Sequence, residues 1–312
     1  MIKIVRLFLP LFMLILSACG NNLTSDSASG NSPTTPTRES DSATFTYQSE
    51  TGPVEVPTNP QRIVALSNGP NVFALGGNIV GIDQWTMMNP LFTEKLEGVE
   101  VVTEDTLEKI IELNPDLIIG STTMKNIDQL SQIAPTVVYT WGKLDYLAQQ
   151  LEIGKLLNKE QEAKEWVDDF KARAEALGEK IRAKIGEDAT VSVIENDSKQ
   201  LYVFGNNWAR GTEILYQAMD LKMPDKVKEL ALGPGYYTLS LEVLPEFAGD
   251  YIVLRKNPDG DSSFLETDTW KNLPAVQNNR VFELNTKAVT YSDPITLEYL
   301  LEFFEESFLG NE

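Results

Sequence analysis

The sequence contains no histidine and a single cysteine. Without histidine, a Ser-His-Asp triad, a zinc site with histidine ligands and a histidine-ligated haem are all excluded. Basic residues are scarce relative to acidic ones, because 26 Lys and Arg stand against 46 Asp and Glu, which gives a formal charge of −20. A charge of this sign argues against a basic face that binds nucleic acid or an anionic membrane.

The sequence also lacks an apolar run long enough to cross a membrane. The longest candidate, Leu7 to Leu16, follows a basic start and is too short for about 30 Å of hydrocarbon. It leads into Leu16-Ser17-Ala18-Cys19, which resembles a bacterial lipobox, where cleavage precedes the cysteine and its thiol carries diacylglycerol. We therefore expect a signal peptide over residues 1–18 and a lipid on Cys19 that anchors the chain to the extracellular face of the cell membrane.

Residues 19–43 are Ser, Thr, Asn, Asp and Pro with almost nothing to bury. Such a composition predicts a disordered tether. It would hold the folded part just outside the membrane, in a compartment without ATP, which disfavours kinases and P-loop enzymes. Gly154-Lys155 lacks the preceding glycine of a Walker loop.

Residues 158–186 predict one long amphipathic helix. Asn158 with Gln161 resembles a capping box, and Gly186 stands where a helix usually ends, so the helix would be about 40 Å long. Strand patterns on both sides favour a rigid connector between two lobes over a long surface helix. The apolar positions that recur at steps of three and four are Ala163, Trp166, Val167, Phe170, Ala174, Leu177, Ile181 and Ile185.

Short apolar runs on each side of this helix predict two sheets. A small hairpin is expected first, from Phe45–Tyr47 and Val54–Val56 with a turn at Thr51-Gly52. Apolar strands separated by helical segments usually form a parallel sheet covered on both faces. We therefore expect an α/β fold with mainly parallel sheets in two lobes, 44–157 and 187–312, and a ligand cleft between them. The runs are 62–66, 79–82, 116–119 and 136–139, then 190–194, 201–204, 250–254 and 280–284.

An internal repeat supports two related lobes. Leu107-Glu108 and Asp116–Ile119 match Leu241-Glu242 and Asp250–Val253 with the same internal spacing. Each copy predicts a helix that runs into a strand and places its glutamate near the helix start. Chance could also produce this match in a chain so rich in Leu and Glu, and acidic residues in a first turn are common.

The loops that follow the strands are rich in aromatic and amide side chains. In open α/β sheets, ligands bind beyond the carboxyl ends of the strands. The loops expected to line the cleft are 67–69, 85–88, 121–125 and 139–141 in the first lobe, and 205–211, 255–264 and 289–291 in the second.

Three short sequence segments resemble a known family, as do the lipobox, the two predicted lobes and the long helix. The segments are Leu113–Ile119, Ala248–Ile252 and Trp270–Leu273. Together they resemble the iron-siderophore substrate-binding lipoproteins of Gram-positive ABC importers. The resemblance implies a monomeric binding protein, not an enzyme, that captures an Fe(III)-siderophore complex. It would deliver this ligand to a membrane permease coupled to a cytoplasmic ATPase. No cofactor is implied, because the siderophore itself holds the iron.

Residues 202–211 are most similar to the ferric-hydroxamate binders of that family. The resemblance implies that Trp208 packs on the ligand and that Arg210 donates hydrogen bonds to the hydroxamate oxygens, which suits the arginine fork. Aromatic residues are implied at Tyr139, Tyr202 and Tyr291, although Tyr291 matches in place and not in identity. Trp85 and Lys125 complete the predicted ligand-binding set.

Charge favours a neutral or cationic ferric hydroxamate. A ferric tris-catecholate carries about three negative charges and needs a cluster of cations. The cleft loops offer Lys125, Lys143, Arg210 and Arg255. Ferric catecholate, ferric citrate or haem stay as alternatives, as does direct iron binding by Tyr236-Tyr237, and a lipid-anchored hydrolase is the alternative from another class.

The resemblance also implies one glutamate per lobe that meets arginines on the permease. Glu108 and Glu242 are the candidates, with Glu112 and Glu246 next.

Overall fold

The computed structural model describes residues 43–197 and 200–310, which belong to one compact unit. The predicted signal peptide, Cys19 and nearly all of the predicted tether lie outside the described residues. None of the helices in the described ranges combines the length and the apolar character that a membrane crossing requires.

The chain begins with the predicted hairpin, in which β1 (Thr44–Ser49) pairs antiparallel with β2 (Gly52–Pro57). Tyr47 and Val56 point inward and are buried against the first lobe. The hairpin thus covers part of the core of that lobe.

The N-terminal lobe is built on a parallel sheet with the strand order β5-β4-β3-β6-β7. Side chains alternate between its faces: Ile63 and Ala65 pack with α1 and α5, whereas Val64 packs with α3 and α4. The four strands predicted for this lobe are confirmed, whereas the short strand β5 was not predicted. The strands are β3 (Ile63–Ala65), β4 (Ile79–Ile82), β5 (Glu100–Val101), β6 (Leu117–Ser121) and β7 (Thr136–Tyr139); the helices are α1 (Gly69–Ala74), α2 (Gln84–Met87), η1 (Pro90–Leu96), α3 (Leu107–Glu112), α4 (Ile127–Ile133) and α5 (Tyr146–Leu156).

The C-terminal lobe has a mixed sheet with the order β10-β9-β8-β11-β12. The strands β8, β11 and β12 are parallel, whereas β9 and β10 are antiparallel to their neighbours. Only two residues separate β8 from β9, and a parallel connection needs about a dozen, so β9 has to turn back. The strands are β8 (Val191–Asp197), β9 (Gln200–Phe204), β10 (Tyr236–Leu239), β11 (Tyr251–Lys256) and β12 (Val281–Asn285).

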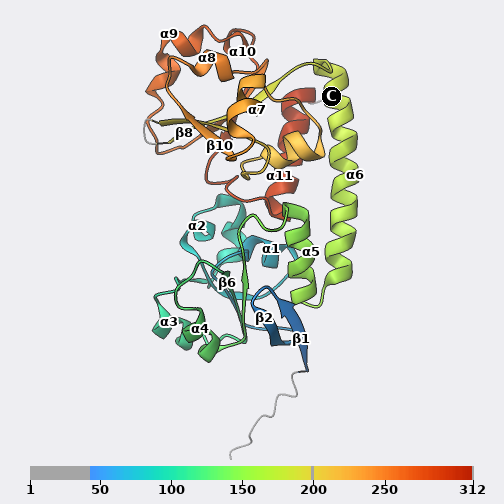
Figure 1. The fold of residues 1–312 in the computed structure, drawn as a ribbon, viewed down its shortest axis with the longest axis vertical. Coiled ribbons are helices and arrows are strands. Elements are labelled where there is room, and N and C mark those ends of the chain that lie inside the picture. The colour runs from blue at the N-terminus through green and yellow to red at the C-terminus, as the bar shows by residue number, and fades with distance from the viewer. Residues whose placement is uncertain (1–42, 198–199, 311–312) are drawn as a thin grey trace, which may run out of the picture. The chain divides into compact units, whose positions relative to one another are not determined.

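The two faces of this second sheet are covered by different sets of helices. One face packs against the long helix α6 and the C-terminal helix α11, and the other packs against α7 to α10. Figure 1 shows α8, α9 and α10 gathered at the top of this lobe. The helices are a π-helical turn η2 (Ile214–Ala218), α7 (Asp225–Ala231), α8 (Leu244–Phe247), η3 (Ser263–Glu266), α9 (Asp268–Lys271), α10 (Pro274–Gln277) and α11 (Pro294–Leu309).

The long helix is α6 (Glu160–Ile185), 26 residues or about 39 Å. Gly186 follows the helix with a φ of 104°, a positive value that glycine adopts easily at a helix end. The predicted capping box is wrong. Asn158 lies outside the helix in the left-handed region, and Gln161 donates to Glu165 on the next turn.

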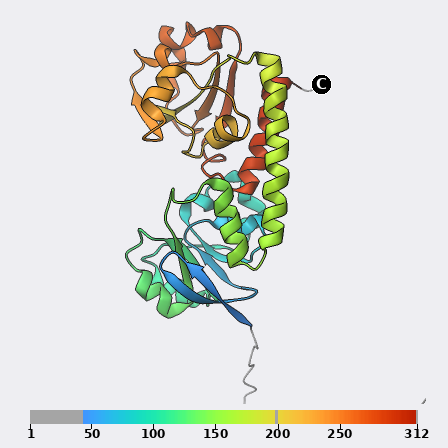
Figure 2. The same ribbon diagram turned by 45° about the vertical axis from the view of Figure 1, so that its right-hand side comes forward.

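Two more helices contact both lobes beside the connecting helix α6. In α11, Ile295 packs on the N-terminal core whereas Leu300 and Phe304 lie in the C-terminal core. In α5, Ile153 lies in the N-terminal core and Leu147 packs on the C-terminal one. Figure 2 shows α11 alongside α6.

Candidate functional site

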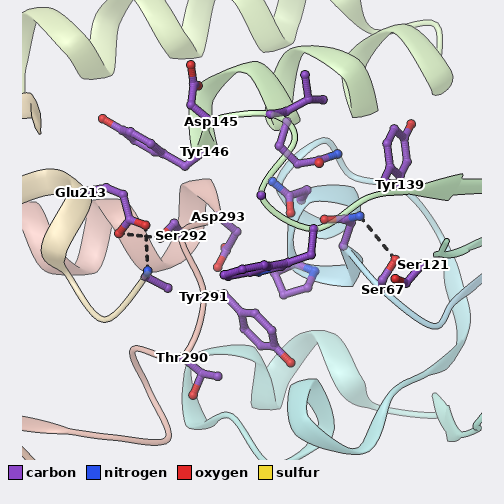
Figure 3. A pocket seen from close by; sticks show the side chains of 18 of the residues that line it. Ser67, Ser121, Tyr139, Asp145, Tyr146, Glu213, Thr290, Tyr291, Ser292 and Asp293 are labelled. Atoms are coloured by element: carbon purple, nitrogen blue, oxygen red, sulfur yellow. Dashed lines mark hydrogen bonds between the residues drawn. The ribbon is translucent and has the colours of Figure 1, made fainter. Parts of the chain in front are cut away.

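A cavity of about 460 Å³ lies between the two lobes, within the size range of small-molecule sites. Figure 3 shows side chains from both lobes converging on it. The N-terminal lobe contributes Leu66, Ser67, Asn68, Pro70, Asn71, Asp83, Trp85, Ser121, Tyr139, Thr140, Trp141, Gly142, Leu144, Asp145, Tyr146 and Gln149; the C-terminal lobe contributes Asn207, Trp208, Ala209, Arg210, Glu213, Thr290, Tyr291, Ser292 and Asp293.

The N-terminal side of the cavity is formed by the segments after β3, β4, β6 and β7. These are the carboxyl ends of parallel strands, as expected for an α/β lobe. Two tryptophans on this side are largely exposed, Trp85 at 69% and Trp141 at 70%. Tyr139 is buried instead, and its hydroxyl lies 3.0 Å from that of Tyr47. Its ring therefore forms part of the wall, while its hydroxyl is engaged within the lobe.

Three of the helix N-termini at the cavity are each capped by their own aspartate, whereas that of α1 has no side-chain cap. Asp83 accepts from backbone N–H groups of α2, Asp145 from those of α5, and Asp293 from those of α11. A helix N-terminus ordinarily attracts anions. Because carboxylates already occupy these three N-termini, they attract a further anion only weakly.

Glu213 adds a fourth carboxylate, which is buried. It accepts from the Ala209 N–H at 2.7 Å and from the hydroxyls of Ser292 and Thr212, each at 3.1 Å; Figure 3 shows its bond to Ser292. Burial raises the pKa of this carboxyl, and the hydrogen bonds only partly oppose the effect. Burial likewise raises the pKa of the neighbouring Tyr146 hydroxyl, with Glu213 adding to the effect.

Trp208 lies among aromatic rings from both lobes. Its ring centroid is 4.8 Å from that of Trp141, edge to face, and 5.1 Å from that of Tyr236. The residue beneath it is Gly235, where a Cβ atom would come 2.4 Å from the indole ring. The glycine is needed because any larger residue would displace Trp208.

Arg210 is held by its backbone and by three contacts. Ala209, Arg210 and Gly211 all have positive φ, which directs the side chain back toward the sheet. The guanidinium donates to the Trp208 carbonyl at 2.9 Å and to Glu195 Oε2 at 3.3 Å, and it lies 5.0 Å from the ring centroid of Phe204. Burial lowers the pKa of this group. Of the described cationic side chains, Arg210 alone lines the cavity.

Tyr291 joins the lobes across the cavity. Its hydroxyl donates to Asp83 Oδ1 at 3.3 Å and accepts from the Thr86 hydroxyl at 3.1 Å. Nearby, the Asn89 amide donates to the Ala288 carbonyl at 3.3 Å. The cavity floor is thus closed by hydrogen bonds between segments far apart in the sequence.

Comparison with known proteins identifies the family. A family model named Periplasmic binding protein matches residues 65–288. The chain belongs to this family. Among its relatives is the iron(3+)-hydroxamate-binding protein FhuD of Bacillus subtilis, 38% identical over 308 residues that cover 96% of this chain and 95% of the relative. Another is the iron(3+)-hydroxamate-binding protein YxeB of the same organism, 35% identical, covering 93% and 91%.

Solved structures agree with this assignment. FhuD2 from Staphylococcus aureus with bound ferrioxamine B has a TM-score of 0.76 and 34% identity, covering 80% of this chain and 98% of that one. The FhuD protein of Staphylococcus pseudintermedius has a TM-score of 0.75 and 32% identity, covering 86% and 99%. The predicted fold class and the resemblance to siderophore-binding proteins are confirmed.

For this member of the family, the structure brings together five of the seven predicted ligand-binding residues: Trp208, Arg210, Tyr139, Tyr291 and Trp85. Tyr202 does not line the cavity; it packs edge to face on Tyr236, 6.0 Å between centroids. Lys125 is exposed, and its backbone N–H donates to Glu104.

The other predicted cations and the segment 255–264 do not line the cavity. Arg255 is fully buried within the sheet, and Lys143 pairs with Glu50 at 3.1 Å. The two adjacent tyrosines contact different neighbours, because Tyr236 packs on Trp208 and Tyr237 stacks on Phe247. That arrangement gives no joint pair of iron ligands.

The prediction from sequence left out the carboxylates and Trp141. Asp83, Asp145 and Asp293 each precede a helical pattern, so a search for N-caps beside the expected loops would have found them. Trp141 lies in a loop that was expected at the cleft, but nothing in its spacing distinguishes it. Glu213 gives no sequence signal, since its burial depends on contacts with Ser292, 79 residues away.

The two candidate docking glutamates are both exposed, one on each lobe. Glu108 lies in the first turn of α3, which leads into β6. Glu242 lies in the turn just before α8, which leads into β11, so it precedes its helix. A hydrogen bond from Ser240 lowers the pKa of the Glu242 carboxyl.

Proposed function

We propose that this chain captures a ferric hydroxamate siderophore in the cavity between its lobes and delivers it to the permease of an ABC importer. Anchored through Cys19 outside the cell membrane, it would act as a monomer and leave its ligand chemically unchanged. The domain boundaries at 18, 43, 157 and 186 belong to the same proposal. The observation that carries it is the cavity itself, with Trp208 and Arg210 from one lobe facing Trp85 and Tyr139 from the other.

The charge of the cavity supports a hydroxamate over a catecholate. Its lining holds four carboxylates, Asp83, Asp145, Glu213 and Asp293, and one guanidinium, Arg210. A ferric tris-hydroxamate is neutral, or cationic when it has a pendant amine, and would meet little repulsion. A tris-catecholate with about three negative charges would meet strong repulsion from these groups.

The hydrogen-bonding groups suit the same ligand. The forked guanidinium of Arg210 can donate to two oxygens of one hydroxamate, and the tryptophan faces can cover the carbon chains of a bulky chelate. The relatives named for iron(3+)-hydroxamate binding and the neighbour with bound ferrioxamine B support this ligand class.

Fluorescence titration tests the ligand class. Tryptophan quenching should saturate with ferrichrome and ferrioxamine B, because Trp85, Trp141 and Trp208 adjoin the cavity. Ferric citrate, a ferric tris-catecholate and haem should bind more weakly or not at all. Tighter binding of any of these three would overturn the proposal, and so would recovery of a chemically altered siderophore.

The delivery step is proposed to use Glu108 and Glu242. Exposed ion pairs at an interface rim orient a partner more than they tighten it. Replacing both glutamates with alanine should abolish siderophore uptake by cells and leave the Kd of the purified protein unchanged. The control replaces Glu94 and Glu305, which are also exposed, one in each lobe. Normal uptake by the Glu108/Glu242 variant, or a weakened Kd, would contradict the assignment.

A further inference from the structure

A buried arginine lies behind the cavity on the C-terminal sheet. Arg255 on β11 is 2% exposed and stands in register with Glu195 on β8. Its guanidinium contacts the Glu195 carboxylate and donates to the carbonyls of Thr286 at 2.9 Å and Val289 at 3.4 Å. Burial lowers the pKa of this guanidinium. A carboxylate in contact with an arginine favours its charged form.

The same carboxylate oxygen also faces the cavity arginine. Glu195 Oε2 lies 3.3 Å from Arg210 Nε, so one carboxylate stands between two guanidiniums. Its side chain is only 13% exposed, so it does not itself offer a ligand contact. The three groups together carry one net positive charge, whereas the two arginines alone would carry two.

We infer that Glu195 sets the electric charge that the cavity presents to its ligand, and thereby selects between siderophores of equal shape and different charge. This inference rests on the proposed function and adds a specificity residue to it. Partly buried charges are screened far less than exposed ones, so a charge change at Glu195 or Arg255 would reach a ligand held at Arg210. Removing Glu195 raises the local charge to two, and removing Arg255 lowers it to zero.

The test uses two ligands of one shape. Ferrioxamine B carries a pendant ammonium group, and its N-acetylated form is neutral around the same iron centre. The quantity measured is the ratio of their Kd values by calorimetry. Glu195→Gln should shift this ratio about three- to tenfold against the cationic ligand, and Arg255→Met should shift it in favour of that ligand. The double variant restores one net charge and should bring the ratio back to the wild-type value.

Two further measurements separate the buried charge from a general effect of surface charge. Both shifts should largely persist when salt is raised from about 0.05 M to 0.5 M, because buried charges are screened far less than exposed ones. Glu283→Gln is the matched control: Glu283 is an exposed carboxylate on β12 that pairs with Lys256, and its removal should leave the ratio unchanged. If Glu195→Gln fails to fold, Arg255→Met and the double variant carry the test.

The outcomes distinguish this inference from the proposed function. A wild-type protein that binds neither ferrioxamine would overturn the proposed function. A wild-type protein that binds both, with ratios that do not move in opposite directions in the two single variants, would overturn only the role of Glu195. A shift in the double variant as large as that in Glu195→Gln would also overturn it, since the net charge there is unchanged.

Discussion

The two lobes share an α/β plan but contribute different chemistry to the cavity. The N-terminal lobe lines it from four segments after parallel strands and supplies the exposed tryptophans and two of the three capping aspartates. The C-terminal lobe lines it from fewer segments, yet supplies Arg210 and Trp208 from the loop after its antiparallel strand β9. We infer that the α/β architecture common to both lobes forms the cleft. The antiparallel strand β9, which the N-terminal lobe lacks, positions the side chains that bind the ligand.

The largest expected effect tests that asymmetry directly. Arg210→Gln should weaken binding of a ferric hydroxamate about 10- to 100-fold, because hydrogen bonds from a charged donor are lost in a partly buried site. Trp85→Ala, on the other lobe, should weaken it only a few-fold, since this side chain is largely exposed. Calorimetric titration of both variants measures the effect without relying on tryptophan emission. Equal losses of affinity would show that the two lobes contribute equally to ligand binding.

The fold was predictable from the sequence because its signals are local. Apolar runs such as 116–119 and 250–254 indicate strands without knowledge of their partners. The 3.6-residue period of α6 likewise indicates a helix without knowledge of what the helix packs against. The strand β10 was missed because Tyr236-Tyr237 follow Gly233-Pro234-Gly235, which resembles a loop. Its pairing with β9 is decided by the tertiary structure.

The site was predictable only where a resemblance or a loop position pointed to it. Trp208 and Arg210 came from a resemblance in one segment, and the structure places both at the cavity. Arg255 was expected at the cleft because it would begin the loop after the predicted strand 250–254, but β11 extends to Lys256 and Arg255 is a buried strand residue. Its partner Glu195 is 60 residues away, so no local pattern could reveal that the pair is buried together.

A smaller effect is expected from two glycines that mark where α6 joins each lobe. A Cβ atom at Gly178 would come 2.3 Å from the Met219 carbonyl oxygen in the C-terminal lobe. At Gly154 it would come 2.5 Å from the Ala163 side chain, between α5 and α6. The first turn of α6, which carries Ala163, can shift more readily than the buried backbone at Met219. Gly178→Ala should therefore destabilise the protein by about 1–2 kcal/mol, after the gain of up to about 1 kcal/mol in helix propensity.

Urea unfolding compares Gly178→Ala with Gly154→Ala, which should cost less. Gly233→Ala is the control, because a Cβ atom there meets nothing within 4 Å. A larger loss at Gly154 would mean that α6 is anchored more firmly to the N-terminal lobe. It would also reverse the view, based on Phe170, Leu177 and Ile181 in the C-terminal core, that most of this helix belongs to the second lobe.

The smallest expected effect is a difference in pH dependence between one carboxylate of each lobe. In the C-terminal lobe, burial raises the pKa of Glu213 above the ordinary 4.5. The folded state then binds its proton at higher pH than the unfolded state, so this contribution to stability is lost as pH rises through the folded pKa. In the N-terminal lobe, burial of Glu50 acts to raise its pKa, but hydrogen bonds from Thr140 and the pairing with Lys143 lower it on balance. Its contribution is present above about 4.5 and is lost as pH falls through the folded pKa.

Thermal unfolding of Glu213→Gln and Glu50→Gln from about pH 4 to pH 8 compares the two. As pH falls toward 4.5, the wild type should gain stability relative to Glu213→Gln, because protonation removes a buried charge that glutamine never carries. Below about pH 4.5 the wild type should lose stability relative to Glu50→Gln, because its ion pair with Lys143 is discharged. Parallel curves for the two variants would mean that the two carboxylates experience the same environment, and that the lobes differ in strand direction but not in the electrostatics around these two groups.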